Sequence, residues 1–237
     1  MLRDRTFLGF IPARKGSKRL PDKNMKILGD SPLFTWVYKA AVDSKIFDKI
    51  VISTDDERIM EHCDKFGIKY DRRPSSLCTD TATIPDAIQE YLKRTGEQYD
   101  YVQILEPTVP LLRHDTIKGA ANLMCDWECD VLISLIPSRV PSGVCKPIPE
   151  HFANKYSLCG WMPDEIRNVQ SQYLQTTYQL NGYIYIIRYD IAYNNRDWWD
   201  SDIRPYLMEH DDCIDIDDKY DFRMAELRLQ ERLENED

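Results

Sequence analysis

The chain has 237 residues, 43% of them hydrophobic and 30% charged, a balance that allows one buried core and argues against a disordered or membrane-embedded protein. The 31 Lys and Arg against 40 Asp and Glu give a formal net charge of −9, the wrong sign for a protein that binds nucleic acid through its phosphates. The seven cysteines are scattered, and the N-terminal apolar run is far too short to span a bilayer. We therefore expect a cytoplasmic protein that binds neither nucleic acid nor membrane.

Apolar runs alternate with amphipathic stretches over the first half of the chain, which is typical of βα units that feed a mainly parallel sheet. Expected strands cover residues 6–12, 49–53, 68–70, 99–105 and 131–136. Expected helices cover residues 31–43, 54–66, 83–93 and 114–126. We expect Ser31, followed by Pro32, to cap the first of these helices, and Thr54 to cap the second, which Gly67 ends. The pattern predicts an α/β fold.

The character of the sequence changes at Pro137. The segment 137–177 contains five prolines and few apolar runs, so we interpret it as a protruding β-hairpin or arm. The apolar pattern returns with expected strands at 182–188 and 213–216 and an expected helix at 218–233. We therefore expect a single domain over residues 1–237, with the arm inserted into it.

The loop after the first expected strand is strongly basic. It carries Arg14, Lys15, Lys18, Arg19 and Lys23 at the carboxyl end of a strand, where open α/β sheets bind their ligands. Lysine and arginine side chains, together with backbone N–H groups at a glycine turn, suit a triphosphate. A solvated basic loop is the alternative on composition alone. The loop is not a Walker A motif, because it lacks the upstream glycine.

Six blocks of the sequence resemble, in order and spacing, the signature of the CMP-sialic acid synthetases, the acylneuraminate cytidylyltransferases. The blocks are I-P-A-R-K-G-S-K-R-L-P-D-K-N at 11–24, I-S-T-D at 52–55, R-P with T-D-T-A-T at 73–83, L-E-P-T-V-P-L at 105–111, N-G-Y-I-Y-I at 181–186 and I-D-I-D at 214–217. Any one block alone is a weak signal, whereas six in order are a strong one.

The resemblance implies a Rossmann-like domain, a mainly parallel sheet with helices on both faces, that transfers CMP from CTP to an acidic sugar for a surface glycan and releases pyrophosphate. It also implies that the Pro-rich arm joins two copies into a homodimer. Residues carried over from the family would hold the triphosphate or line the cytidine pocket. The triphosphate residues are Arg14, Ser17, Lys18 and Lys23, with Asn24 beside them; the cytidine residues are Arg73, Thr81 and Thr83. Of these, Arg14 and Lys23, together with Asp217, would be catalytic.

Asp215 and Asp217 are the candidate metal ligands. Two carboxylates two residues apart on a strand point to the same face, so both can reach one Mg²⁺ that bridges phosphate oxygens. An acidic surface patch is the alternative, since further aspartates lie nearby. The resemblance favours the metal.

The sequence departs from the family on the acceptor side, where the implied contacts are Glu106, Gln172 and Asn181. Glu106 stands where the family has a glutamine, and Ser171 stands where it has an arginine that would grip the acceptor carboxylate. Arg167 is a candidate substitute for that arginine. Both changes weaken the attraction for a carboxylated sugar, which leads to the hypothesis of a hydroxylated or amino-bearing acceptor.

Two other functions remain open from the sequence. The chain could be a cytidylyltransferase of the same fold with an octulosonate or phosphonate acceptor, or a nucleotide-binding module without catalysis. The Trp198–Trp199 pair is interpreted as packing or a subunit contact.

Overall fold

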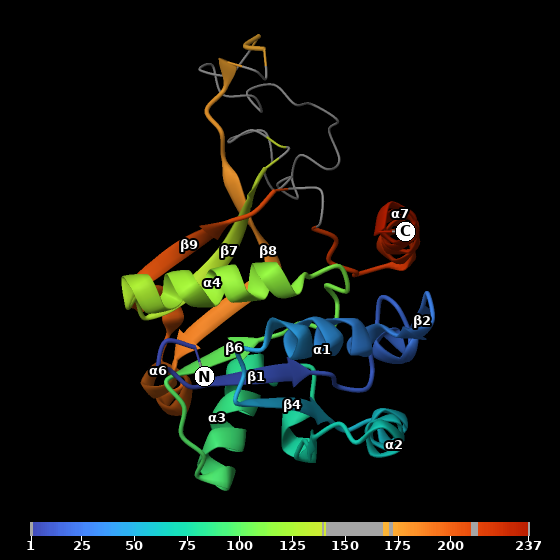
Figure 1. Ribbon diagram of the computed structural model, residues 1–237, viewed down its shortest axis with the longest axis vertical. Coiled ribbons are helices and arrows are strands. Elements are labelled where there is room, and N and C mark those ends of the chain that lie inside the picture. Colours follow the sequence, from blue (N-terminus) through green and yellow to red (C-terminus); the bar gives the residue numbers. More distant parts are fainter. Residues whose placement is uncertain (1, 139, 141–167, 171–172, 210–212, 237) are drawn as a thin grey trace, which may run out of the picture.

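The computed structural model describes residues 2–138, 140, 168–170, 173–209 and 213–236 (Figure 1). Most of the predicted arm at 137–177, including Arg167, Ser171 and Gln172, lies outside the described residues. The strands on either side of the arm are described: the first ends at Pro137 and the second begins at Tyr178. None of the described helices combines the length and the apolar character that crossing a bilayer requires.

A seven-stranded sheet in the order β5-β4-β1-β6-β8-β7-β9 forms the centre of the protein (Figure 1). Its strands are β1 (Phe7–Pro12), β4 (Lys49–Thr54), β5 (Tyr70–Arg72), β6 (Tyr101–Ile104), β7 (Val131–Pro137), β8 (Tyr178–Arg188) and β9 (Ile203–Leu207). All neighbours are parallel except β8, which runs antiparallel to β6 and β7. The expected mainly parallel α/β fold is confirmed.

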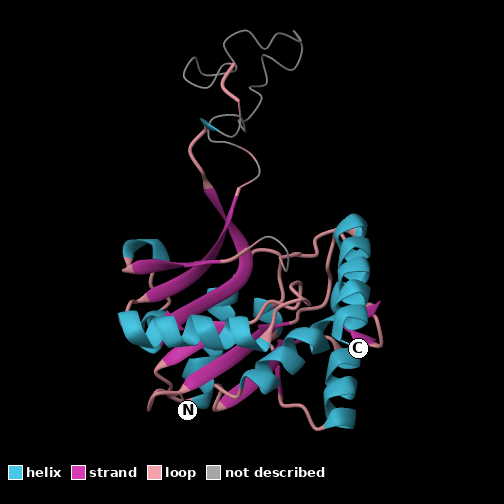
Figure 2. Ribbon diagram, turned by 45° about the horizontal axis from the view of Figure 1, so that its top comes forward, coloured by secondary structure: helices cyan, strands magenta, loops and turns pink. Residues whose placement is uncertain are grey.

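Helices cover both faces of the sheet (Figure 2). The helices are α1 (Leu33–Ser44), α2 (Glu57–Phe66), α3 (Ile84–Thr95), α4 (His114–Trp127), α6 (Tyr189–Asn194) and α7 (Lys219–Glu236), with short 3₁₀ helices η1 (Lys23–Met25), η2 (Ser75–Leu77) and η4 (Trp198–Asp200). Side chains of α1, α2 and α4 share one hydrophobic cluster, and those of α3 and α6 share another.

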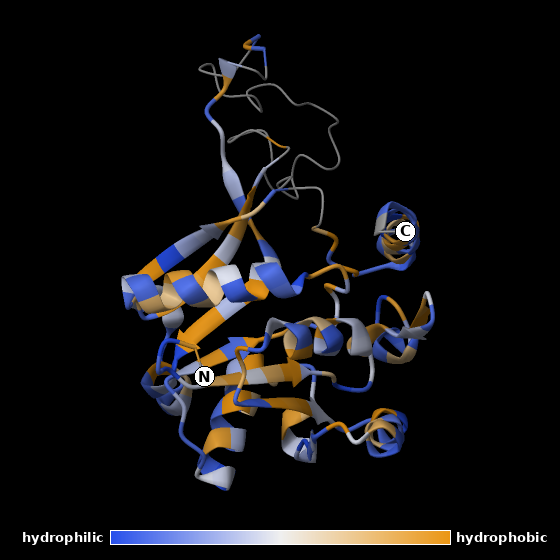
Figure 3. Cartoon of the chain, in the orientation of Figure 1, coloured by the Kyte–Doolittle hydropathy of each residue, from blue (hydrophilic) through white to orange (hydrophobic). Residues whose placement is uncertain are grey.

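The alternation of side chains along β1 explains how one short strand supports two cores. Phe7 and Ile11 pack in the cluster of α1, α2 and α4, while Leu8 and Phe10 pack in the cluster of α3 and α6. Strands buried on both faces have continuous apolar runs, the pattern that predicted them. Figure 3 shows hydrophobic colouring along β4 and much of β8, where the same argument holds.

Both predicted helix caps are wrong. Ser31 and Pro32 form β3, which pairs with β2 (Ile27–Leu28) in a small hairpin, so α1 begins at Leu33. Thr54 ends β4 and donates its hydroxyl to the carbonyl of Ala13 at 2.6 Å. Asp56 caps α2 instead, because its carboxylate accepts from the backbone N–H of Arg58 at 3.0 Å. A hairpin with the preceding residues takes the place of the first cap, and a bond to the distant Ala13 takes the place of the second.

The second half of the chain differs more from the expectations. Residues 213–216 form no strand, although the backbone N–H of Ile216 donates to the carbonyl of Thr108 at 2.8 Å. The sequence did not predict β9, which contains Pro205 and half-exposed residues because it lies at the sheet edge. The helix α6 was missed because six residues are too few to show a period.

Gln103 on β6 provides a test of the core. Its side chain is fully buried, and among the described residues neither amide atom makes a hydrogen bond. We predict that Gln103→Met raises the free energy of unfolding by about 1 kcal/mol, because burying an unpaired amide costs more than burying a thioether of similar size. Urea denaturation followed by circular dichroism measures the change. Gln103→Ala, which removes the same amide but leaves a cavity, serves as the comparison. A free energy of unfolding of Gln103→Met equal to or below that of the unchanged protein contradicts the prediction.

Candidate active site

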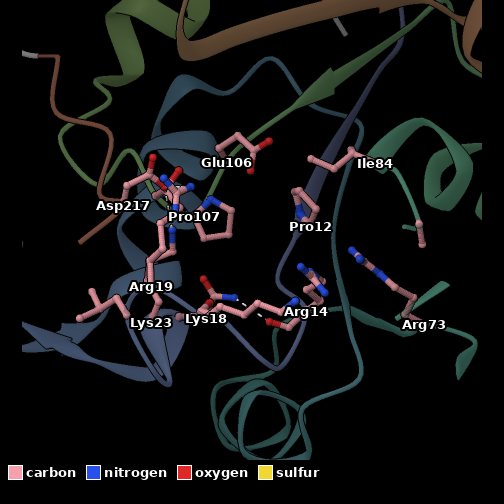
Figure 4. Close-up of a pocket in the computed structure, with 15 residues that line it drawn as sticks. Pro12, Arg14, Lys18, Arg19, Lys23, Arg73, Ile84, Glu106, Pro107 and Asp217 are labelled. Carbon is pink, nitrogen blue, oxygen red and sulfur yellow. Dashed lines mark hydrogen bonds and ion pairs between the residues drawn. The ribbon is translucent and has the colours of Figure 1, made fainter. Parts of the chain in front are cut away.

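The basic loop lines a cleft of about 340 Å³ at the carboxyl ends of β1, β4 and β6 (Figure 4). We call it the basic cleft. Predicted site residues that line it are Arg14, Ser17, Lys18, Lys23, Asn24, Arg73, Glu106 and Asp217. Thr81, Thr83, Asn181 and Asp215 are not part of its lining. The structure therefore gathers most of the predicted nucleotide-binding residues around one space.

Contacts with the end of β4 fix the course of the basic loop. The backbone N–H of Ala13 donates to the carbonyl of Ser53 at 2.9 Å, and that of Lys15 donates to Asp55 Oδ1 at 2.6 Å. From within the loop, Asn24 Nδ2 donates to the carbonyl of Arg14 at 3.1 Å. These bonds join the basic loop to the sequence block at 52–55.

Carboxylates pair with the exposed cations of the loop. Asp80 Oδ2 lies 2.5 Å from Lys18 Nζ, and Asp80 Oδ1 lies 3.4 Å from an Arg14 nitrogen. Hydrogen bonds from Lys18 and then Arg14 lower the pKa of Asp80. Asp217 Oδ1 lies 2.7 Å from an Arg19 nitrogen and 3.7 Å from Lys23 Nζ. An anionic ligand in this cleft would compete with Asp80 and Asp217 for the same cations.

Two further cations of the cleft are largely buried. The Arg73 side chain is buried and donates to Ser53 Oγ and to the carbonyl of Ser53, both at 3.1 Å. The Lys23 side chain is 13% exposed, and its ammonium donates to the carbonyl of Ile216 at 2.7 Å. Burial lowers the pKa of both groups, and Asp217 opposes that effect at Lys23. Positive charge held away from water favours a bound anion.

Glu106 follows β6 and is half-buried. Burial first, and then the charge of Asp215, raise its pKa to about 7, while Lys23 and Arg73 act in the opposite direction. The expectation from the sequence, that Glu106 weakens the attraction for a carboxylated sugar, assumes a fully ionised carboxylate. The structure instead buries the carboxyl, which favours its neutral form, an effect that depends on tertiary packing.

The blocks at 181–186 and 214–217 meet beside the cleft. The Tyr183 hydroxyl donates to the carbonyl of Ile214 at 3.0 Å, and a Cβ on Gly182, whose φ is +75°, would lie 3.1 Å from Asp215 Oδ2. Only glycine fits there without strain. Asp215 keeps an exposed edge, yet its surroundings desolvate the carboxyl and raise its pKa. Ile216 packs with Leu20 of the basic loop, which brings Asp217 to Arg19 and Lys23.

Asn181 and the two threonines occupy other positions. Asn181 accepts from Ser134 Oγ at 2.5 Å and its amide donates to two sulfur atoms, so it holds β8 to β7 outside the basic cleft. Thr83 caps α3 in a capping box with Asp86. The Thr81 hydroxyl lies 3.2 Å from that of Thr79. No group of three or more side chains suited to hold a metal occurs in the described part of the chain.

A second cleft of about 600 Å³ adjoins the basic cleft. It is lined by Thr83, Ile84, Pro85, Ile104, Glu106, Tyr185, Asn195, Arg196, Asp197, Trp198 and Trp199. Ile84 and Glu106 line both clefts. Trp198 packs against Tyr185 with ring centroids 6.0 Å apart, as its interpretation as packing predicted, but Trp199 is 65% exposed. The sequence offers no local signal for this cleft, because its lining comes from separate segments of the chain.

A model of the cytidylyltransferase family matches residues 8–129, which run from β1 to the end of α4 and hold most of the basic cleft. This match covers half of the chain. The chain therefore belongs to the cytidylyltransferase family.

Individual relatives agree with the resemblance found from the six blocks. The N-acylneuraminate cytidylyltransferase of Escherichia coli is 28% identical over 92% of this chain, which spans only 51% of that protein. The CMP-N,N'-diacetyllegionaminic acid synthase of Legionella pneumophila is 29% identical, with 94% of this chain and 96% of that protein covered. A solved CMP:2-keto-3-deoxy-manno-octonic acid synthetase, complexed with CTP, superposes with a TM-score of 0.72 at 17% identity over 96% of this chain and 99% of that one, which supports the fold.

The buried ammonium of Lys23 predicts a large effect on nucleotide binding. We expect Lys23→Met to weaken CTP binding at least about tenfold, because a charge-assisted hydrogen bond to phosphate contributes roughly 1.5–3 kcal/mol. Isothermal titration calorimetry measures the dissociation constant. Lys118→Met, at an exposed position on α4, is the control. An unchanged CTP affinity in Lys23→Met would mean that nucleotide does not occupy the basic cleft.

Because Asp80 pairs with cations of the cleft, its removal is expected to raise the affinity for CTP, whereas removal of the Lys23 charge lowers it. Asp80→Asn leaves Lys18 and Arg14 without their carboxylate partner. We expect it to tighten CTP binding about threefold at low salt, a modest effect because exposed pairs are weak, and to lose this gain as salt screens the charges. The same titration at two ionic strengths tests it, and weaker binding in Asp80→Asn would contradict the competition.

Proposed function

We propose that the chain is a CTP-dependent cytidylyltransferase that transfers CMP to an acidic sugar and releases pyrophosphate. The observation that carries this proposal is the meeting of two clefts at Glu106, one basic and at the strand ends, the other larger and partly aromatic. Transfer of CMP needs a triphosphate site and an acceptor site that share a wall. The names of the curated relatives support an acidic sugar as the acceptor.

The basic cleft would hold the triphosphate. Arg14, Ser17, Lys18 and Lys23 would bind its phosphates, and Arg73 would face the cytidine end, beside Ala82 and Ile84. Phosphoryl transfer needs little covalent work from a protein. Its main need is positive charge fixed where the departing pyrophosphate gains negative charge, which these side chains supply.

Asp215 and Asp217 are the candidate ligands of a magnesium ion, although residues 213–216 form no strand that would align the two side chains. Mg²⁺ prefers oxygen ligands and is usually held by one or two carboxylates together with substrate phosphates. Asp217 lines the basic cleft among the phosphate-binding cations, and Asp215 lies two residues before it. We propose that these two aspartates hold the ion. When bound, Mg²⁺ would neutralise phosphate charge.

The location and assembly of the protein are part of the proposal. Among the described cysteines, Cys63, Cys78, Cys125 and Cys129 are free thiols, which supports a cytoplasmic location. A homodimer is supported by the family resemblance alone. Light scattering would test it, since two copies of a 27.9 kDa chain give twice that mass.

Pyrophosphate release tests the function directly. The protein is incubated with CTP, Mg²⁺ and one acceptor at a time: an N-acylated nonulosonate, an octulosonate or a phosphonate. We expect release with the nonulosonate, and at least about a hundredfold less release by Asp217→Ala, because the loss of a metal ligand removes several kcal/mol of charge stabilisation. Asp64→Ala, at an exposed position on α2, is the matched control. CTP binding without release for any acceptor would favour a non-catalytic module.

A further inference from the structure

Glu106 occupies the point where a transfer reaction would take place. It lines both the basic cleft and the second cleft, and the hydrophobic Ile84 is the one other residue in both linings among the described residues. In Figure 4 its carboxyl lies between Asp217 and Ile84. An acceptor hydroxyl that attacks the α-phosphate of CTP must lie where the two clefts join, next to this carboxyl.

The Glu106 carboxylate is free to accept a proton. No described residue donates a hydrogen bond to it or forms an ion pair with it, although it is half-buried. Two other carboxylates line the clefts within the described chain. Asp217 is paired with Arg19 and lies close to Lys23. Asp197 lines the second cleft but not the basic cleft, and it caps η4. No described histidine lines either cleft.

We propose that Glu106 is the catalytic base, an inference that rests on the proposed function. As the acceptor oxygen bonds to the α-phosphorus of CTP, its proton passes to the Glu106 carboxylate. The bond from the α-phosphorus to the bridging oxygen breaks, and pyrophosphate leaves with the electron pair toward the cations of the basic cleft. Glu106 then returns the proton to solvent through the open second cleft. The balance needs no other reactant.

The charges around Glu106 set the pH at which it acts. Burial and then Asp215 raise its pKa, Lys23 and Arg73 lower it, and Tyr185 of β8 lines the second cleft together with it. Because the ionised form is the active one, kcat/KM rises with pH, about tenfold per unit, until the carboxyl is ionised, and then levels off.

The decisive comparison is between Glu106→Gln and Glu106→Asp. Glutamine has nearly the same shape but accepts no proton, whereas aspartate restores the carboxylate at a shorter reach. We expect Glu106→Gln to lower kcat about a hundredfold and to remove this pH dependence, as loss of a general base does. We expect Glu106→Asp to recover part of the rate and to keep the pH dependence. Glu61→Gln, on the exposed face of α2, is the matched control.

Calorimetric titration with CTP and thermal unfolding of each variant separate catalysis from binding and folding. The proposal requires that Glu106→Gln binds CTP within about twofold of the unchanged protein, since catalysis and not binding is lost. A fall in kcat smaller than tenfold, an unchanged pH profile, or a matching loss of CTP affinity overturns the role of Glu106 and leaves the cytidylyltransferase proposal intact. No pyrophosphate release by the unchanged protein overturns the proposed function itself, and with it this inference.

Discussion

The architecture of the site depends on holding like charges together where parallel strands end. Five basic side chains line one small cleft of an otherwise acidic chain: Arg14, Lys18, Arg19, Lys23 and Arg73. Asp80 and Asp217 offset part of their repulsion, and the backbone carbonyls of Ser53 and Ile216 accept from the buried ones. A triphosphate would replace these internal partners with one dense anion, which is the physical reason to expect a nucleotide there.

Distant parts of the chain reach the cleft through a few contacts. The sheet brings together the ends of β1, β4 and β6, while the segment 213–217 returns to the cleft by bonding Thr108 and the hydroxyl of Tyr183. A third hydrophobic cluster, which joins Leu20, Ile216 and Leu229 of α7, fixes that return. Asp217 thus depends on the C-terminal helix for its position.

The sequence predicts the parts of this arrangement that depend on local pattern. Continuous apolar runs located the parallel strands, and the basic loop followed from its place after the first of them. The caps at Ser31 and Thr54 were wrong because a hairpin and a bond to Ala13 decide those positions. The second cleft could not be predicted, because it forms from α3, β8 and the short helices after β8. The shifted pKa of Glu106 likewise depends on burial that no spacing shows.

A crystal structure of the protein with a non-hydrolysable CTP analogue and Mg²⁺ tests the central claim most directly. The account predicts phosphates within hydrogen-bond distance of Arg14, Lys18 and Lys23, cytosine near Arg73, and the α-phosphate beside Glu106. It also predicts that Asp80 and Asp217 have released the cations they pair with in the free protein. An analogue bound outside the basic cleft, or one whose α-phosphate lies away from Glu106, would contradict it.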